Sequence, residues 1–486
     1  MELFDAILNK IDDIVWGLPT IILILATGLI LTIRTKGMQF TKLGRALKSI
    51  FRKSDGEHHG EVSSFGALCT ALSATIGTGN IVGVATAIAA GGPGALFWMW
   101  MAALVGICTK YAECMLSVAY REKKADGHIL GGPFYTIEKG LKDLTGFSWK
   151  WLAILFALFG VLSGVLGIGT ITQVNGIASA VNNAFDPQNT HIAFTLFDNS
   201  YSWATVISGV LVTVFAALVI IGGLQRISKV AQVVVPFMAV IYVFLGVSVL
   251  IMNATHIPQA FAVILKCAFG GKALAGGMLG WTIQQAMQKG VARGIFSNEA
   301  GLGSAAIAAS SAQVEEPVAQ GLVSMTGTFI DTIIICTMTG LAIIIAFFTG
   351  TDAQGIPETL KGVAITSSAF TTVLGGDGCS VQFLLMICLV FFAFTTILGW
   401  DYYSERCIEY ITNGKMKLVM IYRFIYIFSV AIGPYLTVSE VWTIADITNG
   451  LMAIPNCISL ILLSGVIAKM TKDYLTKYPT LESETK

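Results

Sequence analysis

Long apolar segments, separated by shorter polar ones, repeat along the whole chain. A helix needs about 20 mostly apolar residues to cross the hydrocarbon core of a bilayer, which is about 30 Å thick. The pattern therefore predicts an all-α polytopic membrane protein with about eleven transmembrane helices, and polar loops at 183–202 and 349–379. The expected spans lie near residues 14–33, 63–90, 93–119, 150–182, 203–224, 230–252, 273–311, 317–348, 381–411, 418–438 and 441–468.

Two of the expected spans are interrupted by glycine and polar residues. The string "GTGN" at 77–80 breaks the second span, and "SNEAG" at 297–301 breaks the seventh. Irregular backbone within a membrane is tolerated only where it is buried in protein or lines a cavity, because lipid offers no hydrogen-bond partners. Close packing of helices would explain Gly83, but it does not explain the polar residues. The two breaks therefore predict a binding site near the middle of the membrane.

The two interrupted spans are also similar in sequence. The string "ATAIAAGGP" at 85–93 resembles "SAAIAASSA" at 304–312, and each follows a break. Because the copies are an odd number of spans apart, they cross the membrane in opposite directions. This is the pattern of an inverted repeat of five helices. We expect the repeats at 62–255 and 270–468, an extra N-terminal helix with a basic loop at 1–61, and a tail at 469–486.

Composition and charge narrow the class of protein and set its orientation. Charged residues make up 12% of the 486-residue chain and the mean hydropathy is +0.75, whereas soluble domains carry about 25% charged residues. The net charge of +1 gives no indication of a nucleic-acid partner. Lys and Arg gather in 34–61, 121–150 and the tail. Since cytoplasmic loops collect these residues, we expect a plasma-membrane protein with its N-terminus outside and its C-terminus in the cytoplasm.

Two adjacent hydroxyls in the ninth span are candidates for ion binding. Thr395 and Thr396, with the carbonyl of Phe392, could offer oxygen atoms to Na⁺ packed between helices, because hard cations prefer oxygen ligands. Alternatively, both hydroxyls could bond to carbonyls of their own helix. The two helix breaks favour the ion site.

Several charged residues lie within or beside the spans, where a charge indicates a functional site by default. Lys110 and Glu113 are three residues apart on one helical face and are expected to pair. Arg293 and Glu299 flank the second break and favour a gate or a scaffold. Asp331, in the eighth span, is either functional or a hydrogen-bonded packing residue.

Four sequence blocks resemble the alanine or glycine:cation symporter family, the sodium:alanine symporters. They are "GTGNIVGVATAIA" at 77–89, "GGPGALFWMWMAALVG" at 91–106, "GGPFYTIEKGL" at 131–141 and "KGVARGIFSNEAGLGSAAIA" at 289–308. The resemblance implies Na⁺-coupled uptake of alanine, and often glycine, by a leucine-transporter-type fold in the lipid bilayer.

The resemblance also implies a site at the two breaks. The N–H groups of Thr78 and Gly79 would meet the substrate carboxylate, and Asn80 would lie near the substrate or a second Na⁺. Because "SATIGTGNIVG" at 73–83 contains no acidic residue, the ammonium group would meet carbonyl and side-chain oxygens, or Glu299. The residues implied for substrate binding are Thr78, Gly79, Asn80, Gln173, Phe296, Ser297 and Asn298. Those implied for Na⁺ are Ser73, Ile76, Phe392, Thr395 and Thr396.

Other functions stay open at this point. A carrier coupled to protons or another cation, with another small amino acid as substrate, would use the same breaks. A channel could also be lined by discontinuous helices, although the inverted repeat favours a carrier. A membrane enzyme is least supported, because the spans contain no HExxH or GxSxG motif. The sequence carries no signal for the oligomeric state.

Overall fold

The protein is described by a computed structural model, in which almost all residues are helical. The structure describes residues 2–50, 60–124, 128–196, 199–269, 282–350, 354–375, 378–436 and 438–480. Its N-terminal part contains α1 (Glu2–Val15), α2 (Leu18–Arg34), α3 (Met38–Thr41), α4 (Leu43–Ser49), α5 (Ser64–Thr75), the π-helix η1 (Gly79–Gly83), α6 (Val84–Gly91) and α7 (Gly94–Ala119). Next come β1 (Glu122–Lys123), β2 (Ile129–Leu130), α8 (Pro133–Tyr135), the π-helix η2 (Thr136–Gly140), α9 (Leu141–Thr145), α10 (Lys150–Leu166) and α11 (Ile171–Phe185).

The remainder of the chain continues the helical pattern. It contains β3 (Ile192–Leu196), β4 (Asn199–Ser202), α12 (Trp203–Ile220), α13 (Gly223–Met252), the 3₁₀ turn η3 (Ala254–His256), α14 (Ile257–Phe269), α15 (Ile283–Asn298), α16 (Ser304–Ser310) and α17 (Pro317–Thr328). It ends with the π-helix η4 (Phe329–Cys336), α18 (Thr337–Phe348), α19 (Val363–Leu374), α20 (Gly378–Ile411), α21 (Met416–Ile432), the 3₁₀ turn η5 (Gly433–Tyr435), α22 (Val438–Leu462) and α23 (Ser464–Lys477).

Most of the expected spans are present as helices. Within the described residues, nine helical stretches are long and apolar enough to cross a membrane, and the bent pair α5 and η1–α6 makes a tenth. The pair α15 and α16 is not among these stretches. Five residues separate α15 from α16, and residues 270–281 before α15 lie outside the described ranges. The expected number of eleven is therefore approximate.

Two segments expected to be loops contain regular structure. The 349–379 segment holds the twelve-residue helix α19, and the 183–202 segment holds the antiparallel hairpin β3–β4. The short apolar helix α14 was also not expected. These elements are too short to cross a bilayer, so a search for apolar stretches of about 20 residues passes over them.

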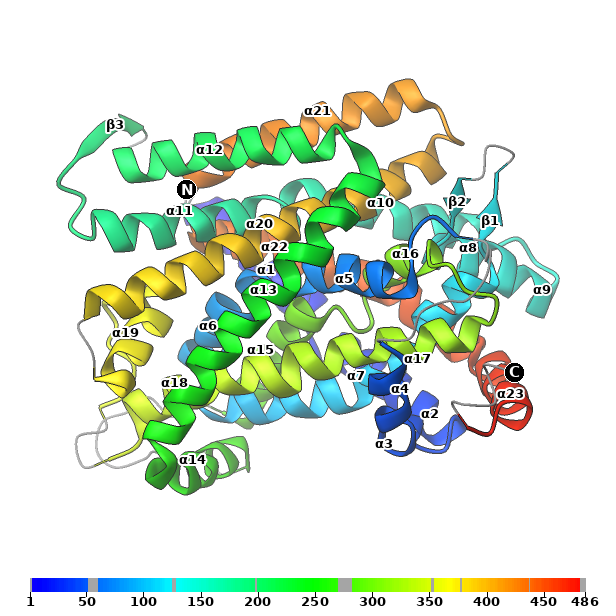
Figure 1. Cartoon of the computed structure of the whole chain (residues 1–486), viewed down its shortest axis with the longest axis horizontal. Helices are drawn as coiled ribbons and strands as arrows, with labels where there is room; N and C mark the ends of the chain where they lie inside the picture. Colours follow the sequence, from blue (N-terminus) through cyan, green and yellow to red (C-terminus); the bar gives the residue numbers. More distant parts are fainter. Residues whose placement is uncertain are drawn as a thin grey trace.

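The helices form a bundle with two distinct ends (Figure 1). The β3–β4 hairpin, α19 and α14 lie at one end, and the β1–β2 hairpin, α9 and α23 lie at the other. The second end also holds the described parts of the Lys- and Arg-rich segment, 121–124 and 128–150, and α23 with the following residues up to 480. We call it the basic end. Large apolar side chains such as Phe215 on α12 and Phe244 on α13 are exposed, as is expected of a surface that faces lipid.

Glycine allows the central helices to approach one another closely. A Cβ atom added at Gly290 of α15 would lie 2.3 Å from the carbonyl oxygen of Ala95 on α7. One added at Gly321 of α17 would lie 2.8 Å from the ring of Tyr111 on α7. Small residues allow such contacts between helices in membranes. Both α15, which leads to the second break, and α17, which leads to Asp331, therefore pack on α7.

Candidate functional site

The first break lies between α5 and η1, and its free backbone groups are bound by side chains. The two parts of the helix are bent by 48°. The Gly77 N–H donates to Asn80 Oδ1 at 3.0 Å, and the Thr78 N–H donates to Gln173 Oε1 of α11 at 3.1 Å. All four residues are among those predicted to lie at or beside the site, and their contacts keep the break ordered inside the protein.

One group of oxygen atoms joins the first break to α20. The Thr396 hydroxyl lies 3.0 Å from the carbonyl oxygen of Ser73, 3.3 Å from that of Ile76 and 3.0 Å from that of Phe392. All four residues are buried. We call these three carbonyls and one hydroxyl the neutral cluster. It combines oxygen ligands from two helices and contains no formal charge.

The structure separates the two adjacent threonines. Thr395 donates to the carbonyls of Phe391 and Phe392 in its own helix, at 3.1 and 3.0 Å, and its hydroxyl lies 3.8 Å from the sulfur of Met238 on α13. Successive residues are about 100° apart around an α-helix. Only Thr396 therefore reaches α5, while Thr395 follows the alternative of bonding within its helix.

A second group of oxygen atoms joins both breaks to η4. The Asp331 carboxylate is fully buried and accepts hydrogen bonds from Asn80 Nδ2 at 2.6 Å, Ser297 Oγ at 2.9 Å and Thr332 Oγ1 at 2.8 Å. We call these four residues the Asp331 cluster. Among the described residues, no lysine, arginine or histidine lies within ion-pair distance of this carboxylate. It is the acidic group that the first break itself lacks.

The two breaks are in direct contact. A Cβ atom added at Gly79 would lie 3.1 Å from Cα of Ser297 and 3.2 Å from the ring of Phe296. Asn298 is turned toward η4, where its amide donates to Thr332 Oγ1 at 2.9 Å. Of the predicted residues in the second break, Phe296 and Ser297 therefore face the first break, while Asn298 supports the Asp331 cluster.

Carboxylates hold the second break in its conformation. Glu299 has a left-handed backbone, with φ of 56°, and ends α15. Its carboxylate accepts from Trp400 Nε1 at 2.6 Å and from Ser304 Oγ at 2.7 Å. Both of its oxygens are thus engaged by donors of the scaffold, which agrees with the scaffold role considered for Glu299 rather than with contact to an ammonium group.

The expected pair of Lys110 with Glu113 is wrong. Glu113 accepts from the Gly301 N–H at 2.9 Å and from Asn456 Nδ2 at 2.6 Å. Lys110 Nζ is buried and makes no hydrogen bond within the described part of the chain. The spacing on α7 permits a pair, but the unpaired N–H groups of the second break compete for the carboxylate.

Two aromatic side chains and an ion pair cover the second break. The Phe296 ring packs on Trp442 of α22 with centroids 4.8 Å apart, and the Arg293 guanidinium lies 4.6 Å from the Trp442 ring centroid. Arg293 also pairs with Asp446 at 2.5 Å. We call these four residues the aromatic lid. Trp442 and Asp446 come from α22 and could not be placed here from sequence alone.

The N-terminal helix α1 contacts this lid. Trp16, at its end, donates from Nε1 to the carbonyl oxygen of Asp446 at 2.8 Å. Asp12 of α1 lies 3.9 Å from the ammonium group of Lys289, one turn before Arg293. The N-terminal helix thus contacts both helices that carry the aromatic lid, α22 through Asp446 and α15 through Lys289.

A cavity of about 210 Å³ leads toward the first break from the end of the bundle that carries α19. It reaches Gly176, where an added Cβ would lie 2.5 Å from the Thr78 side chain, and Trp442 of the lid. The lining residues are Val82, Asn175, Gly176, Ser179, Asn182, Asn183, Pro187, Lys361, Gly362, Val363, Ala364 and Trp442.

These features together define a secondary transporter, because discontinuous helices that meet at a buried site are the signature of inverted-repeat carriers. The solved structure of MhsT in complex with L-phenylalanine is similar over 87% of this chain and 100% of that chain, with a TM-score of 0.51 and 14% identity. The similarity confirms the predicted leucine-transporter-type fold.

The chain belongs to the sodium:alanine symporter family, whose model matches residues 1–485. It is 44% identical to the sodium/alanine symporter AgcS of Methanococcus maripaludis, over 97% of each chain. It is 35% identical to the probable sodium/glutamine symporter GlnT of Bacillus subtilis, over 97% of this chain and 91% of that protein. The family resemblance is confirmed, and the protein is a multi-pass membrane transporter rather than an enzyme.

Proposed function

We propose that this protein carries alanine or glycine into the cell together with Na⁺, by alternating access across the plasma membrane. The observation that carries the proposal is that both helix breaks meet at the buried Asp331 cluster, while the first break also forms the buried neutral cluster with α20. Membership of the sodium:alanine symporter family supports the choice of Na⁺ and alanine.

The orientation and the limits of the repeats belong to the same proposal. Lys and Arg gather at the basic end, which supports a cytoplasmic C-terminus and an outside N-terminus. The repeats would occupy 62–255 and 270–468, with 1–61 as an addition and 469–486 as a tail. The cavity beside α19 would then be the outer entrance.

In this proposal the neutral cluster binds Na⁺. Carbonyl oxygens of Ser73 and Ile76 would ligate the ion from α5. The carbonyl of Phe392 and the hydroxyl of Thr396 would ligate it from α20, in keeping with the preference of hard cations for oxygen. Thr395 would join them only after its hydroxyl leaves the carbonyls of its own helix.

The Asp331 cluster is our proposed second cation position. A buried carboxylate without a basic partner is costly unless a cation or hydrogen-bond donors balance it. The oxygen of Ser297 would share a cation bound by Asp331. Asn80 would link this position to the first break, because its side chain contacts both Gly77 and Asp331.

The substrate would lie between the two breaks. Thr78 and Gly79 would present backbone N–H groups to its carboxylate, since the first N–H groups of a helix attract anions. The contact of Thr78 with Gln173 would fix the position of that segment. The narrow space between Gly79 and Phe296 favours a small side chain. The remaining substrate contacts would come from Ser297 and Asn298.

The test is uptake of labelled alanine into proteoliposomes with an imposed Na⁺ gradient. We expect uptake that depends on Na⁺ and is competed by unlabelled glycine. Uptake that is unchanged when choline replaces Na⁺ would overturn the coupling. Unlabelled serine, D-alanine and glutamine in the same assay would measure selectivity, and stronger competition by glutamine than by alanine would overturn the small-substrate assignment.

A further inference from the structure

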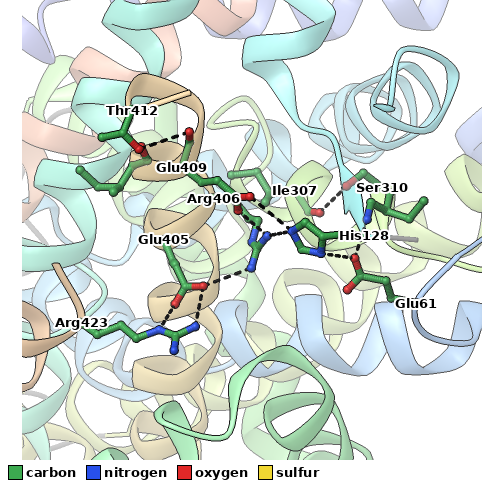
Figure 2. Close-up of polar contacts among 11 residues, drawn as sticks. Glu61, His128, Ile307, Ser310, Glu405, Arg406, Glu409, Thr412 and Arg423 are labelled. Carbon is green, nitrogen blue, oxygen red and sulfur yellow. Dashed lines mark hydrogen bonds and ion pairs between the residues drawn. The ribbon is translucent and has the colours of Figure 1, made fainter. Parts of the chain in front are cut away.

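A chain of charged side chains crosses the basic end of the bundle (Figure 2). His128, beside the β1–β2 hairpin, lies 2.8 Å from Glu61 Oε1 through Nδ1 and 3.5 Å from Glu409 Oε1 through Nε2. Glu61 stands just before α5, and Glu409 lies near the end of α20. His128 therefore connects the beginning of α5 with the end of α20.

Two arginines continue the chain within α20 and onto α21. Arg406, which contacts His128, donates to Glu409 at 2.5 Å and to Glu405 at 3.1 Å. Arg423 of α21 holds Glu405 through two hydrogen bonds of 2.5 and 2.9 Å. Glu405, Arg406 and Glu409 are all buried, so these contacts are weakly screened by solvent.

The charges of these six side chains, Glu61, His128, Glu405, Arg406, Glu409 and Arg423, sum to zero only when His128 is protonated. Three carboxylates and two guanidinium groups leave one negative charge, which an imidazolium would neutralise. Hydrogen bonds to Glu409 and Glu61 raise the pKa of His128 to about 9, although burial and the nearby charge of Arg406 act in the opposite direction. The two neighbouring carboxylates therefore favour the protonated form of His128 at neutral pH.

The residues just before α5, which His128 contacts through Glu61, are also hydrogen-bonded to the residues that follow α16. The N–H groups of Glu61 and Val62 donate to the carbonyl of Ser311 at 2.8 and 3.2 Å, and the Gln313 N–H donates to the carbonyl of Val62 at 2.8 Å. Arg121 adds hydrogen bonds of 2.7 to 2.9 Å to the carbonyl of Ser310 at the end of α16 and to those of Ala312 and Val314 after it. The basic ends of α5 and α16 are thus joined as one unit, which His128 attaches to α20.

The same two helices form the neutral cluster. Ser73 and Ile76 at the end of α5 face Thr396 of α20. Thr396 and Glu409 are 13 positions apart on α20, or about 20 Å at 1.5 Å per residue. Movement of α5 away from α20 would therefore break both sets of contacts at once: those of the neutral cluster and those of His128.

We propose that His128 is a latch of the transport cycle: bound between Glu61 and Glu409, it holds α5 against α20, and its release opens the neutral cluster toward the basic end. This inference rests on the proposed carrier function. His128 is a positioning residue, since it contacts neither of the two oxygen clusters.

The latch predicts a pH dependence with a definite sign. Because the pKa of His128 is raised from 6.5 to about 9, its contribution to the closed state is complete below about pH 6.5 and is lost as the pH rises through about 9. Charged side chains in contact with the His128 ring in the described part of the chain include those of Glu61, Glu409 and Arg406. High pH at the basic end should therefore favour opening.

Alkylation of Cys69 on α5, which is buried in this structure, provides a direct test. A carrier that keeps Cys69 as its only cysteine would be treated with a membrane-permeant maleimide, with and without Na⁺. We expect His128→Gln to raise the rate of alkylation about tenfold at pH 7, the effect of losing a charge-assisted hydrogen bond. The ratio of the variant rate to the wild-type rate should fall toward one at pH 9.5.

The matched control is His191→Gln. His191 lies beside the β3–β4 hairpin at the other end of the bundle and is also near a carboxylate, that of Asp186. This control should label like the wild-type protein at both pH values. Equal labelling of His128→Gln and the wild-type protein at pH 7 would overturn the latch.

A second variant keeps the test informative if His128→Gln does not fold. Glu61→Gln removes the carboxylate that His128 contacts before α5 and should raise the labelling of Cys69 at pH 7. Combining Glu61→Gln with His128→Gln should give no further increase, because the two residues act in one contact. Additive effects would contradict the latch. If wild-type uptake is independent of Na⁺, the proposed function fails, whereas the labelling difference between variants still decides whether the latch exists.

Discussion

The neutral cluster and the Asp331 cluster both contact the first break, but they differ in charge. When no ion is bound, the Thr396 hydroxyl can donate its one proton to any one of the three neutral carbonyls around it, so no formal charge is left without a partner. The Asp331 carboxylate has no such internal balance and depends on donors from Asn80, Ser297 and Thr332. An uncharged site can release an ion at low electrostatic cost, whereas a buried carboxylate holds it or exchanges it for a proton.

This difference assigns separate tasks to the two clusters in our proposal. The neutral cluster lies between α5 and α20, so ion release there can accompany a movement of helices. The Asp331 cluster lies between both breaks and η4, so an ion there would fix the shape of the substrate site. Substitutions that change one cluster alone can test the division.

The largest effect is expected for Asp331→Asn. The change removes the only formal charge of the Asp331 cluster and replaces one of the two oxygens that accept from Asn80 and Ser297 with an NH₂ donor. Initial uptake of labelled alanine should fall about 100-fold, as loss of a buried charged partner typically costs 2–3 kcal/mol or more. Asp331→Glu, which keeps the charge, should retain more activity, and size-exclusion chromatography would verify folding. If Asp331→Asn took up alanine at the wild-type rate, Asp331 would not bind a coupling cation, and only the neutral cluster would remain as a candidate ion site.

Gly79→Val should have the next largest effect, because it acts where the two breaks touch. The added carbon would lie 3.1 Å from the Ser297 backbone and 3.2 Å from Phe296. We expect alanine binding, measured by scintillation proximity, to weaken about 30-fold through overpacking and loss of access to the backbone. The control is Gly83→Ala, since its added carbon meets no atom closer than 3.9 Å. If Gly79→Val and Gly83→Ala bound alanine equally well, Gly79 would not be part of the substrate site.

Thr396→Ala should change the Na⁺ dependence rather than alanine selectivity. Loss of one of the four oxygens of the neutral cluster should raise the Na⁺ concentration for half-maximal uptake about tenfold. Thr396→Ser, which keeps the hydroxyl, should stay near the wild-type value. An unchanged Na⁺ dependence in Thr396→Ala would mean that the neutral cluster is not the coupling site.

Thr395→Ala should have the smallest effect. Its hydroxyl bonds within α20 and faces Met238. Because a hydroxyl that bonds to its own helix offers no oxygen to the ion site, the half-maximal Na⁺ concentration should change less than about twofold. A shift as large as that of Thr396→Ala would show that Thr395 joins the ion site in another state of the cycle.

The sequence predicted the fold and the place of the site better than the chemistry of the site. Apolar length and the two breaks are local features, and they predicted the helical bundle. The contacts of Thr396 with Ser73 and Ile76 were implied by the family resemblance and not by the breaks. The site residues themselves stay a prediction. Asp331 could be recognised as an acidic residue in an apolar span, but its contacts with Asn80 and Ser297 depend on how three distant helices pack. The expected pair of Lys110 and Glu113 failed for the same reason, because Gly301 in the second break and Asn456 on α22 bind the Glu113 carboxylate.

The contact of α1 with the aromatic lid has a practical consequence for producing the protein. Trp16 and Asp12 connect the start of the chain to Asp446 and Lys289. An affinity tag or fluorescent fusion at the N-terminus would therefore attach to a helix that contacts the aromatic lid. A tag at the C-terminus, beyond α23 at the opposite side of the bundle, is the better choice for kinetic work.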